Sequence, residues 1–332
     1  MVLQYLKTTV FEYAKLSSAH FIFLTAIIPV TGAIAMGQKD VLLLTLVFLI
    51  GLTAHIFGFA FNHYKDIEVD RLSSQINKRP LLSGTISKQH ALFFIVTVLL
   101  LGCVLTVISF GILLLLLYIV GVVLAGLYDM FSKRITGMDV ILAAAVVVGV
   151  IFGAGSVSFQ FPPLLFILCV LAFLQTLNLN LIAGGLKDAD HDYLINSHHL
   201  STRLGVRVKD NVFHIPSSFR YIAYLLSLAY AFFVLAPVLL GIITLNIFFL
   251  GVLVIINILF FLVTAKMLHL KKFQRQQIRT YIVLQYTINW SNIPILLISI
   301  APLAGFLLFY PIIGLIISNL LLYRTVFRSQ VM

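Results

Sequence analysis

The sequence predicts an all-α, polytopic membrane protein, a bundle of nine or ten transmembrane helices. Of its 332 residues 61% are hydrophobic and only 10% are charged, whereas a soluble globular domain carries about 25% charged residues. Apolar runs close to the ~20 residues that span a bilayer recur along nearly the whole chain. Runs such as 112–126 are apolar on every face, which excludes the alternating pattern of barrel strands.

The chain divides into a short N-terminal arm and a series of spans, which we treat as one transmembrane domain over residues 1–332. Residues 1–17 are predicted to form an amphipathic segment on the membrane surface. Eight spans are expected at approximately 18–36, 41–62, 90–109, 111–128, 138–158, 163–184, 220–239 and 243–265. Residues 282–325 contain three prolines. They are long enough for two further spans, or for one broken helix and a re-entrant piece.

Basic residues lie almost entirely on one side of the predicted membrane. Of the 22 Lys and Arg, all except Lys39 fall in the N-terminal arm, the alternate connections or the tail. Such residues collect on the cytoplasmic side, so loops 63–89 and 185–219 should be cytoplasmic, in a cell-membrane protein. The net charge of +11 then belongs to a membrane surface, and no nucleic-acid partner is expected. Residues 266–279 are predicted to face anionic lipid.

Acidic residues cluster in two windows on this basic side. Six of the eleven acids lie there, 122 residues apart: Asp66, Glu68, Asp70 and Asp188, Asp190, Asp192. On a helix, the spacing of Asn62, Asp66 and Asp70 places them on one face, and Asp188 and Asp192 share another. Grouped carboxylates repel one another unless a cation holds them, and Mg²⁺ favours one or two carboxylates plus phosphate oxygens. The two windows therefore predict magnesium ions that face one diphosphate.

Cations near the two windows in sequence could neutralise the phosphates. They are Arg71, Lys78, Arg79, Lys133, Arg134 and Lys187. With the metal they would stabilise a departing diphosphate. An allylic diphosphate then ionises to a carbocation, which needs a dry, aromatic-lined pocket. A bundle with 28 Phe and 13 Tyr can provide such a pocket.

Three segments carry these residues in chain order, each on a basic connection. They are Asn62-x₃-Asp66-x₃-Asp70-Arg71 with Lys78-Arg79-Pro80-Leu81-x-Ser83-Gly84, then Tyr128-x₄-Lys133-Arg134 with Asp139, and finally Lys187-Asp188-x₃-Asp192. This ordered set resembles the signatures of the UbiA family of intramembrane prenyltransferases, over roughly residues 15–270. The sequence departs from the family pattern at His63, where Asp is common, and at Asp129, where Ser is usual.

The resemblance implies a helical bundle around a central cavity that opens to the membrane. It implies Mg²⁺ ligands and catalytic groups at Asn62, Asp66, Asp70, Asp188 and Asp192, and substrate contacts from Arg71, Lys78 or Arg79, Tyr128, Lys133, Arg134 and Lys187. The expected reaction is transfer of a prenyl chain from a prenyl diphosphate to a hydrophobic or aromatic acceptor. The residues leave open whether that acceptor is a lipid or a quinone precursor, and how long the prenyl chain is.

A secondary transporter or cation exchanger is the alternative function for such a set of acids. Transporters place their ionisable residues near the bilayer midplane, often in broken helices. Here most acids fall at the cytoplasmic ends of the predicted spans, beside cations suited to phosphate. The sequence therefore favours the enzyme. Polar residues within the sixth span, among them Gln175, Asn178 and Asn180, are expected either to bond between helices or to line the cavity.

Overall fold

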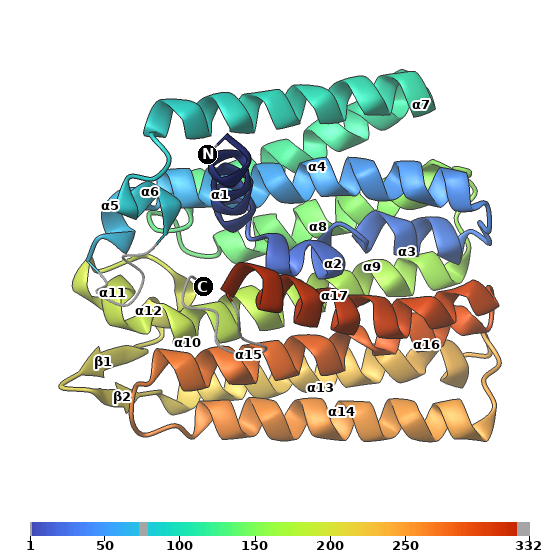
Figure 1. Ribbon diagram of the computed structural model, residues 1–332. Helices are drawn as coiled ribbons and strands as arrows, with labels where there is room; N and C mark the ends of the chain where they lie inside the picture. Colours follow the sequence, from blue (N-terminus) through green and yellow to red (C-terminus); the bar gives the residue numbers. More distant parts are fainter. Residues whose placement is uncertain (1, 73–78, 324–332) are drawn as a thin grey trace.

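Long helices lie side by side along a common axis in the computed structural model, which describes residues 2–72 and 79–323 (Figure 1). Within these residues, six helical segments are long and apolar enough to cross a membrane: Val41–Lys65 (α4), Lys88–Phe131 (α7), Met138–Gly155 (α8), Pro163–Lys187, Ser217–Leu239 (α13) and Ile247–Leu268 (α14). A bent pair, Thr9–Leu16 with Ala19–Ala35, would make a seventh. The polytopic helical bundle is thus confirmed, while nine or ten spans stays a prediction.

Polar caps mark where several spans begin. Asp40 accepts a hydrogen bond from the backbone N–H of Leu42 at the start of α4, at 2.9 Å. Ser87 and Asn246 accept comparable bonds at the starts of α7 and α14. Such bonds satisfy backbone donors that have no partner within the helix, so these spans begin at defined residues.

Helix α7, Lys88–Phe131, consists of two antiparallel helical arms of 44 residues in total (Figure 1). A straight helix of that length would measure about 66 Å, twice the ~30 Å hydrocarbon core. The chain turns back at Gly111, whose φ of 78° and ψ of −173° are accessible only to glycine. Figure 1 shows the second arm returning beneath the first. The predicted division of this region near residue 110 is therefore confirmed.

The N-terminal segment is bent and packs against α8. It comprises α1 (Val2–Leu16), η1 (Ala19–Phe21), α2 (Ile22–Thr25) and α3 (Ile28–Ala35). The two halves of the segment meet at 63°. A Cβ on Gly153 of α8 would overlap the carbonyl of Pro29, and one on Gly32 would overlap the carbonyl of Val150. Small residues permit this close helix crossing, as is common in membrane bundles.

The span after α8 contains a π-helical section, and the C-terminal helices are short. The span comprises α9 (Pro163–Leu177), the π-helix η2 (Asn178–Gly184) and α10 (Gly185–Lys187). Beyond α14 come α15 (Arg275–Trp290), α16 (Asn292–Ile298), η3 (Pro302–Gly305) and α17 (Phe306–Tyr323). The predicted C-terminal region is thus a succession of helices interrupted near Ser291 and at Pro302.

Short elements gather at one end of the bundle, on the left in Figure 1, which we call the polar end. They are α5 (Ile67–Asp70), α6 (Pro80–Ser83), α11 (Ala189–Leu194), α12 (Leu200–Arg203), β1 (Arg207–Lys209) and β2 (Val212–His214). The two strands pair antiparallel, and Val212 also bridges to Lys272. Both loops that were predicted to carry the acidic windows therefore meet at the same end.

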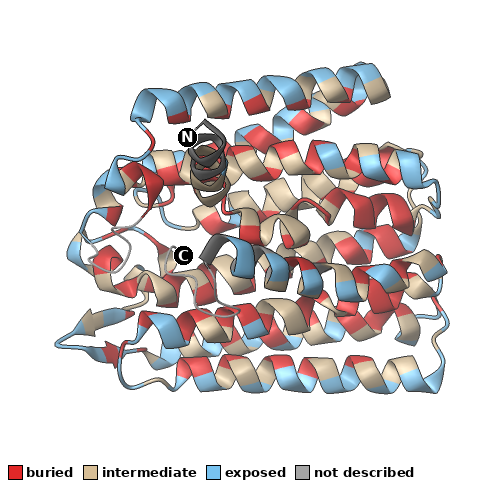
Figure 2. Cartoon of the chain, in the orientation of Figure 1, coloured by how far each residue is buried: buried red, intermediate tan, exposed pale blue. Residues whose placement is uncertain are grey.

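Apolar side chains are exposed along the outer helices. Phe93 and Ile108 of α7 and Ile247 of α14 are 74%, 78% and 82% exposed. Figure 2 shows exposed residues along α7 and α14, and buried residues concentrated on the helices between them. An apolar surface this extensive is characteristic of contact with lipid rather than water, as expected of a multi-pass membrane protein.

Candidate active site

The first acidic window forms where α4 ends. Asn62 lies in the last turn of α4, and the helix is interrupted at Asp66, which has φ −86° and ψ 2°. The side chains of Asn62 and Asp66 line a cavity inside the bundle. Asp70, at the end of α5, is buried and forms an ion pair with Arg79 instead. The expected common face therefore holds for Asn62 and Asp66, whereas Asp70 is not among the residues that line the cavity.

The second window forms at a similar break. Helix α10 ends at Lys187, Asp188 has φ −99° and ψ 6°, and α11 begins at the next residue. The side chains of Lys187 and Asp188 line the same cavity as Asp66. Asp192 is 1% exposed and accepts a hydrogen bond from the ammonium group of Lys133 at 2.7 Å. The two windows, 122 residues apart in sequence, thus meet across one cavity.

The cavity has a volume of about 450 Å³, within the range of small-molecule sites. Its polar section contains one acid from each window, Asp66 and Asp188, and the cations Arg79, Lys133 and Lys187. Its remaining walls are mainly apolar and aromatic, and include Phe21, Phe59, Tyr118, Phe152, Tyr286 and Trp290. One compartment therefore joins a charged end to an apolar interior.

The predicted cations fall into three groups. Arg79, Lys133 and Lys187 line the cavity. Arg71 and Arg134 are exposed and are not among its lining residues. Lys78 lies outside the described residues. Three of the six predicted phosphate contacts are therefore brought to the site.

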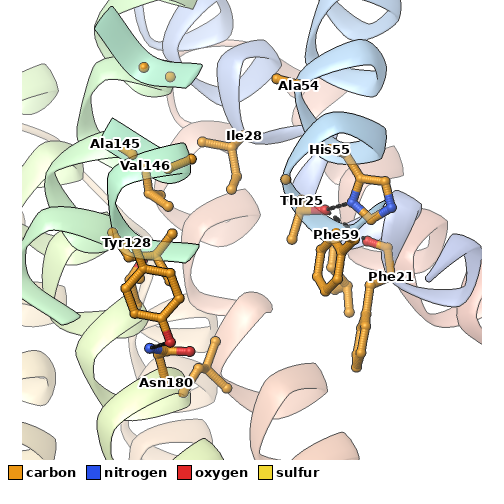
Figure 3. A pocket seen from close by; sticks show the side chains of 18 of the residues that line it. Phe21, Thr25, Ile28, Ala54, His55, Phe59, Tyr128, Ala145, Val146 and Asn180 are labelled. Atoms are coloured by element: carbon orange, nitrogen blue, oxygen red, sulfur yellow. Dashed lines mark hydrogen bonds between the residues drawn. The ribbon is translucent and has the colours of Figure 1, made fainter. Parts of the chain in front are cut away.

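Tyr128 lines the cavity, and a network of hydrogen bonds holds its hydroxyl group in place. Its hydroxyl accepts a hydrogen bond from the amide of Asn180 at 2.7 Å, and the same amide nitrogen donates to Asp139 at 2.6 Å. His199 lies 3.1 Å from the same carboxylate oxygen of Asp139. Figure 3 shows Tyr128 and Asn180 together on one side, with His55 on the other. Because the hydroxyl of Tyr128 accepts from Asn180, its own proton remains available to a ligand.

Burial and neighbouring charges set the protonation of the acidic windows. Burial raises the pKa of Asp66 to about 6; the carboxylates of Asp70 and Asp188 add to this shift, while Lys133 and Arg79 oppose it. Burial also acts to raise the pKa of Asp188, but Lys187 and the other cations around it outweigh burial and hold that pKa well below its usual range. A cation bound between the windows would favour the ionised form of both carboxylates.

The oxygen donors around the cavity suit a hard divalent cation. The amide of Asn62 donates to Oδ1 of Asp129 at 3.1 Å, which leaves its own oxygen available. The other carboxylate oxygen of Asp129 is buried and has no hydrogen-bond partner among the residues that the structure describes. Within the described parts of the chain, no three acidic, His or Cys side chains are already arranged around one point. Mg²⁺ needs only one or two carboxylates, with phosphate and water oxygens completing its shell, so Asn62, Asp66 and Asp188 fit it.

The sequence reasoning missed three residues, one of which lines the cavity. Asp129 was noted only as a departure from the family pattern, yet it lines the cavity and contacts Asn62. Arg275 and Arg279 were expected to face lipid, but they are 2% and 5% exposed, so that prediction was wrong for them. Their spacing relative to Ile278 and Ile282 could have revealed it, because all four lie on the buried face of α15.

Comparisons with known proteins agree on one family. The profile of the UbiA prenyltransferase family matches residues 23–293. A comparison with curated protein sequences gives no significant match.

Solved structures share the fold at low sequence identity. A digeranylgeranylglyceryl phosphate synthase aligns with a TM-score of 0.63 and 20% identity, over 88% of this chain and 98% of its own. A UbiA homologue from Archaeoglobus fulgidus bound to GPP and Mg²⁺ aligns with a TM-score of 0.62 and 15% identity, over 85% and 99%. A UbiA homologue from Aeropyrum pernix K1 aligns at 0.61 and 15%, over 82% and 94%. With the family profile covering most of its length, the chain belongs to the UbiA prenyltransferase family.

Proposed function

We propose that this protein transfers a polyprenyl group from a prenyl diphosphate to a lipid or quinone-precursor acceptor, with Mg²⁺ as cofactor. The observation that carries the proposal is the meeting of Asp66 and Asp188 at the charged end of one cavity, beside Arg79, Lys133 and Lys187. The fold neighbours from Archaeoglobus fulgidus, bound to GPP or DMAPP with Mg²⁺, support the choice of donor. The positions of the basic residues support a site on the cytoplasmic side of the cell membrane.

The chain's own side chains divide the work of the proposed reaction. Asn62, Asp66 and Asp188 would hold Mg²⁺, which when bound supplies positive charge to the departing diphosphate. Lys133, Lys187 and Arg79 line the same end and neutralise phosphate oxygens. The allylic carbocation that forms as the diphosphate leaves would be stabilised by the nearby aromatic walls. Water exclusion by those walls protects the cation until an acceptor attacks.

The remaining predicted residues have less direct parts in this proposal. Asp70 and Asp192 form ion pairs with Arg79 and Lys133, respectively. Asp70 and Asp192 can bind a metal ion only if Arg79 and Lys133 turn away from them toward the diphosphate. We expect this change of partners when Mg²⁺ and the prenyl diphosphate both bind. Arg71, Lys78 and Arg134 stay predicted phosphate contacts. The transporter alternative is less well supported, because Asp66 and Asp188 lie beside cations suited to phosphate at one end of the bundle.

Purified protein in lipid nanodiscs, supplied with labelled geranylgeranyl diphosphate, tests the proposal. The acceptor panel would contain a glyceryl phosphate ether and an aromatic quinone precursor. We expect diphosphate release and prenyl transfer to one of them, lost with EDTA and restored by Mg²⁺. The proposal would be contradicted if the prenyl diphosphate bound equally well with and without Mg²⁺. It would also be contradicted if the protein carried cations across proteoliposome membranes and transferred no prenyl group.

The middle of the cavity should accommodate the prenyl chain. Along α4 and at its C-terminal end, residues recur every four positions and line the cavity: Ile50, Ala54, Gly58, Asn62 and Asp66. A Cβ added at Gly58 meets no atom within 4 Å, so a larger side chain there would enter the open space.

Gly58→Phe is therefore expected to lower turnover of geranylgeranyl diphosphate about tenfold or more, because the ring would occupy space that the prenyl chain needs, and a tenfold loss corresponds to only about 1.4 kcal/mol. Binding of inorganic pyrophosphate at the charged end should be unchanged. Gly251→Phe is the matched control, because Gly251 also has free space but lies on the exposed face of α14. Equal turnover in both variants would place the prenyl chain elsewhere.

A further inference from the structure

Arg275, the first residue of α15, is buried at the polar end of the bundle. It is only 2% exposed, and it is among the largest fully buried side chains in the described chain. A buried arginine requires strong polar partners, because an unpaired charge in a protein interior is very costly. Arg275 is not among the residues that line the cavity, so it acts through the groups that it contacts.

Arg275 makes four polar contacts with residues of the second acidic window. The Nε of Arg275 donates to the carbonyl of Lys187 at 3.2 Å. One terminal nitrogen donates to Asp190 at 2.8 Å and to Asp188 at 3.3 Å. The same nitrogen lies 3.0 Å from Nδ1 of His191. One side chain, 85 residues away from Asp190 in sequence, thus contacts four of the five residues 187–191.

The contacts fall where the helix breaks. Helix α10 ends at Lys187, and its last carbonyls have no partners within the helix. A cation at a helix C-terminus is favourable, and the planar guanidinium can bind a carbonyl and two carboxylates at fixed angles. Arg275 therefore holds the backbone turn from which Lys187 and Asp188 reach the cavity.

We propose that Arg275 is a positioning residue: it fixes the turn over residues 187–190 so that Asp188 meets Asp66 across the cavity, and thereby sets the affinity for the divalent cation. This inference rests on the proposed function, because it takes Asp188 as a metal ligand. Outer groups that orient metal ligands typically contribute 10- to 100-fold in metal affinity.

The test measures binding of Mn²⁺, a paramagnetic substitute for Mg²⁺, by electron paramagnetic resonance in the presence of inorganic pyrophosphate. We expect Arg275→Gln to raise the Mn²⁺ dissociation constant about 10- to 100-fold. Arg275→Lys should also weaken binding, because an ammonium group keeps the charge but lacks the planar fork. Lys272→Gln, an exposed cation on the same connection, should bind Mn²⁺ like wild type.

A second variant covers the case in which the Arg275 substitutions do not fold. Asp190→Asn removes the negative charge from the 2.8 Å contact between Asp190 and Arg275, at a residue that does not line the cavity. We expect Asp190→Asn to weaken Mn²⁺ binding as well. Its effect should be smaller in the Arg275→Lys protein than in wild type, because the two residues act through the same contact.

The outcomes separate the inference from the proposed function. Unchanged Mn²⁺ affinity in Arg275→Lys or Asp190→Asn, with only a lower melting temperature, would reduce Arg275 to a structural role and overturn the inference alone. Failure of the wild-type protein to bind Mn²⁺ with pyrophosphate would overturn both.

Discussion

Replacing Asp66 or Asp188 by alanine is expected to abolish prenyl transfer while leaving the protein folded. Both side chains line the charged end of the cavity, Asp66 from the first acidic window and Asp188 from the second. Removing a group that stabilises charge in a transition state typically costs 10²–10³-fold in rate, and here the loss of a metal ligand should reach at least that. Initial rates of transfer from labelled geranylgeranyl diphosphate, together with Mn²⁺ binding, measure the effect.

The two variants should differ in stability. The pKa of Asp66, about 6, is raised above its usual value, so at neutral pH its ionised form works against folding and alanine should not lower the melting temperature. The pKa of Asp188 is held below its usual range, so its charge contributes stability at neutral pH that Asp188→Ala loses. Asp188→Asn keeps the size of the side chain and helps to separate these effects.

Glu68→Ala is the matched control for the first window. Glu68 lies between Asp66 and Asp70 but is exposed, so its removal should leave both rate and stability close to wild type. Full activity in both Asp66→Ala and Asp188→Ala would refute the assignment of the acidic windows.

Lys133→Met is expected to lower both stability and donor binding. The ammonium group of Lys133 lies 2.7 Å from Asp192, whose side chain is 2% exposed. Burial acts to lower the pKa of Lys133, but Asp192 and the other nearby carboxylates outweigh it and raise that pKa well above its usual range. Breaking a buried ion pair leaves an uncompensated charge, so we expect a loss of about 2 kcal/mol or more in unfolding free energy.

A double variant separates the two roles of Lys133. In Lys133→Met with Asp192→Asn the charge of Asp192 is removed together with its closest partner, so much of the lost stability should return. Pyrophosphate binding should stay weak, because the cavity still lacks the cation. Arg207→Met, at an exposed position on β1, is the control. Recovery of pyrophosphate binding in the double variant would show that Lys133 serves only as the partner of Asp192.

Local patterns were sufficient to predict a polytopic helical bundle and to point to the two acidic windows. Hydropathy depends only on neighbouring residues, and the turn near Gly111 follows from the length of an apolar run that exceeds one bilayer. The pairing of acidic windows with cations, in the order found in the UbiA family, was likewise readable along the chain. Some spans were less predictable, since the bend after α1 and the π-helical section of η2 depend on packing against other helices.

The sequence alone determined which chemical groups are available: carboxylates and cations in the loops of the polar end, and long apolar segments that form the spans. Only the tertiary structure decided how these groups are distributed. It brings Asp66 and Asp188 to the cavity, pairs Lys133 with Asp192 across 59 residues of sequence, and buries Arg275 against Asp190 across 85. The physical reason is that hydropathy and helical spacing are local properties, whereas the partner of a buried charge is set by which distant segments pack together.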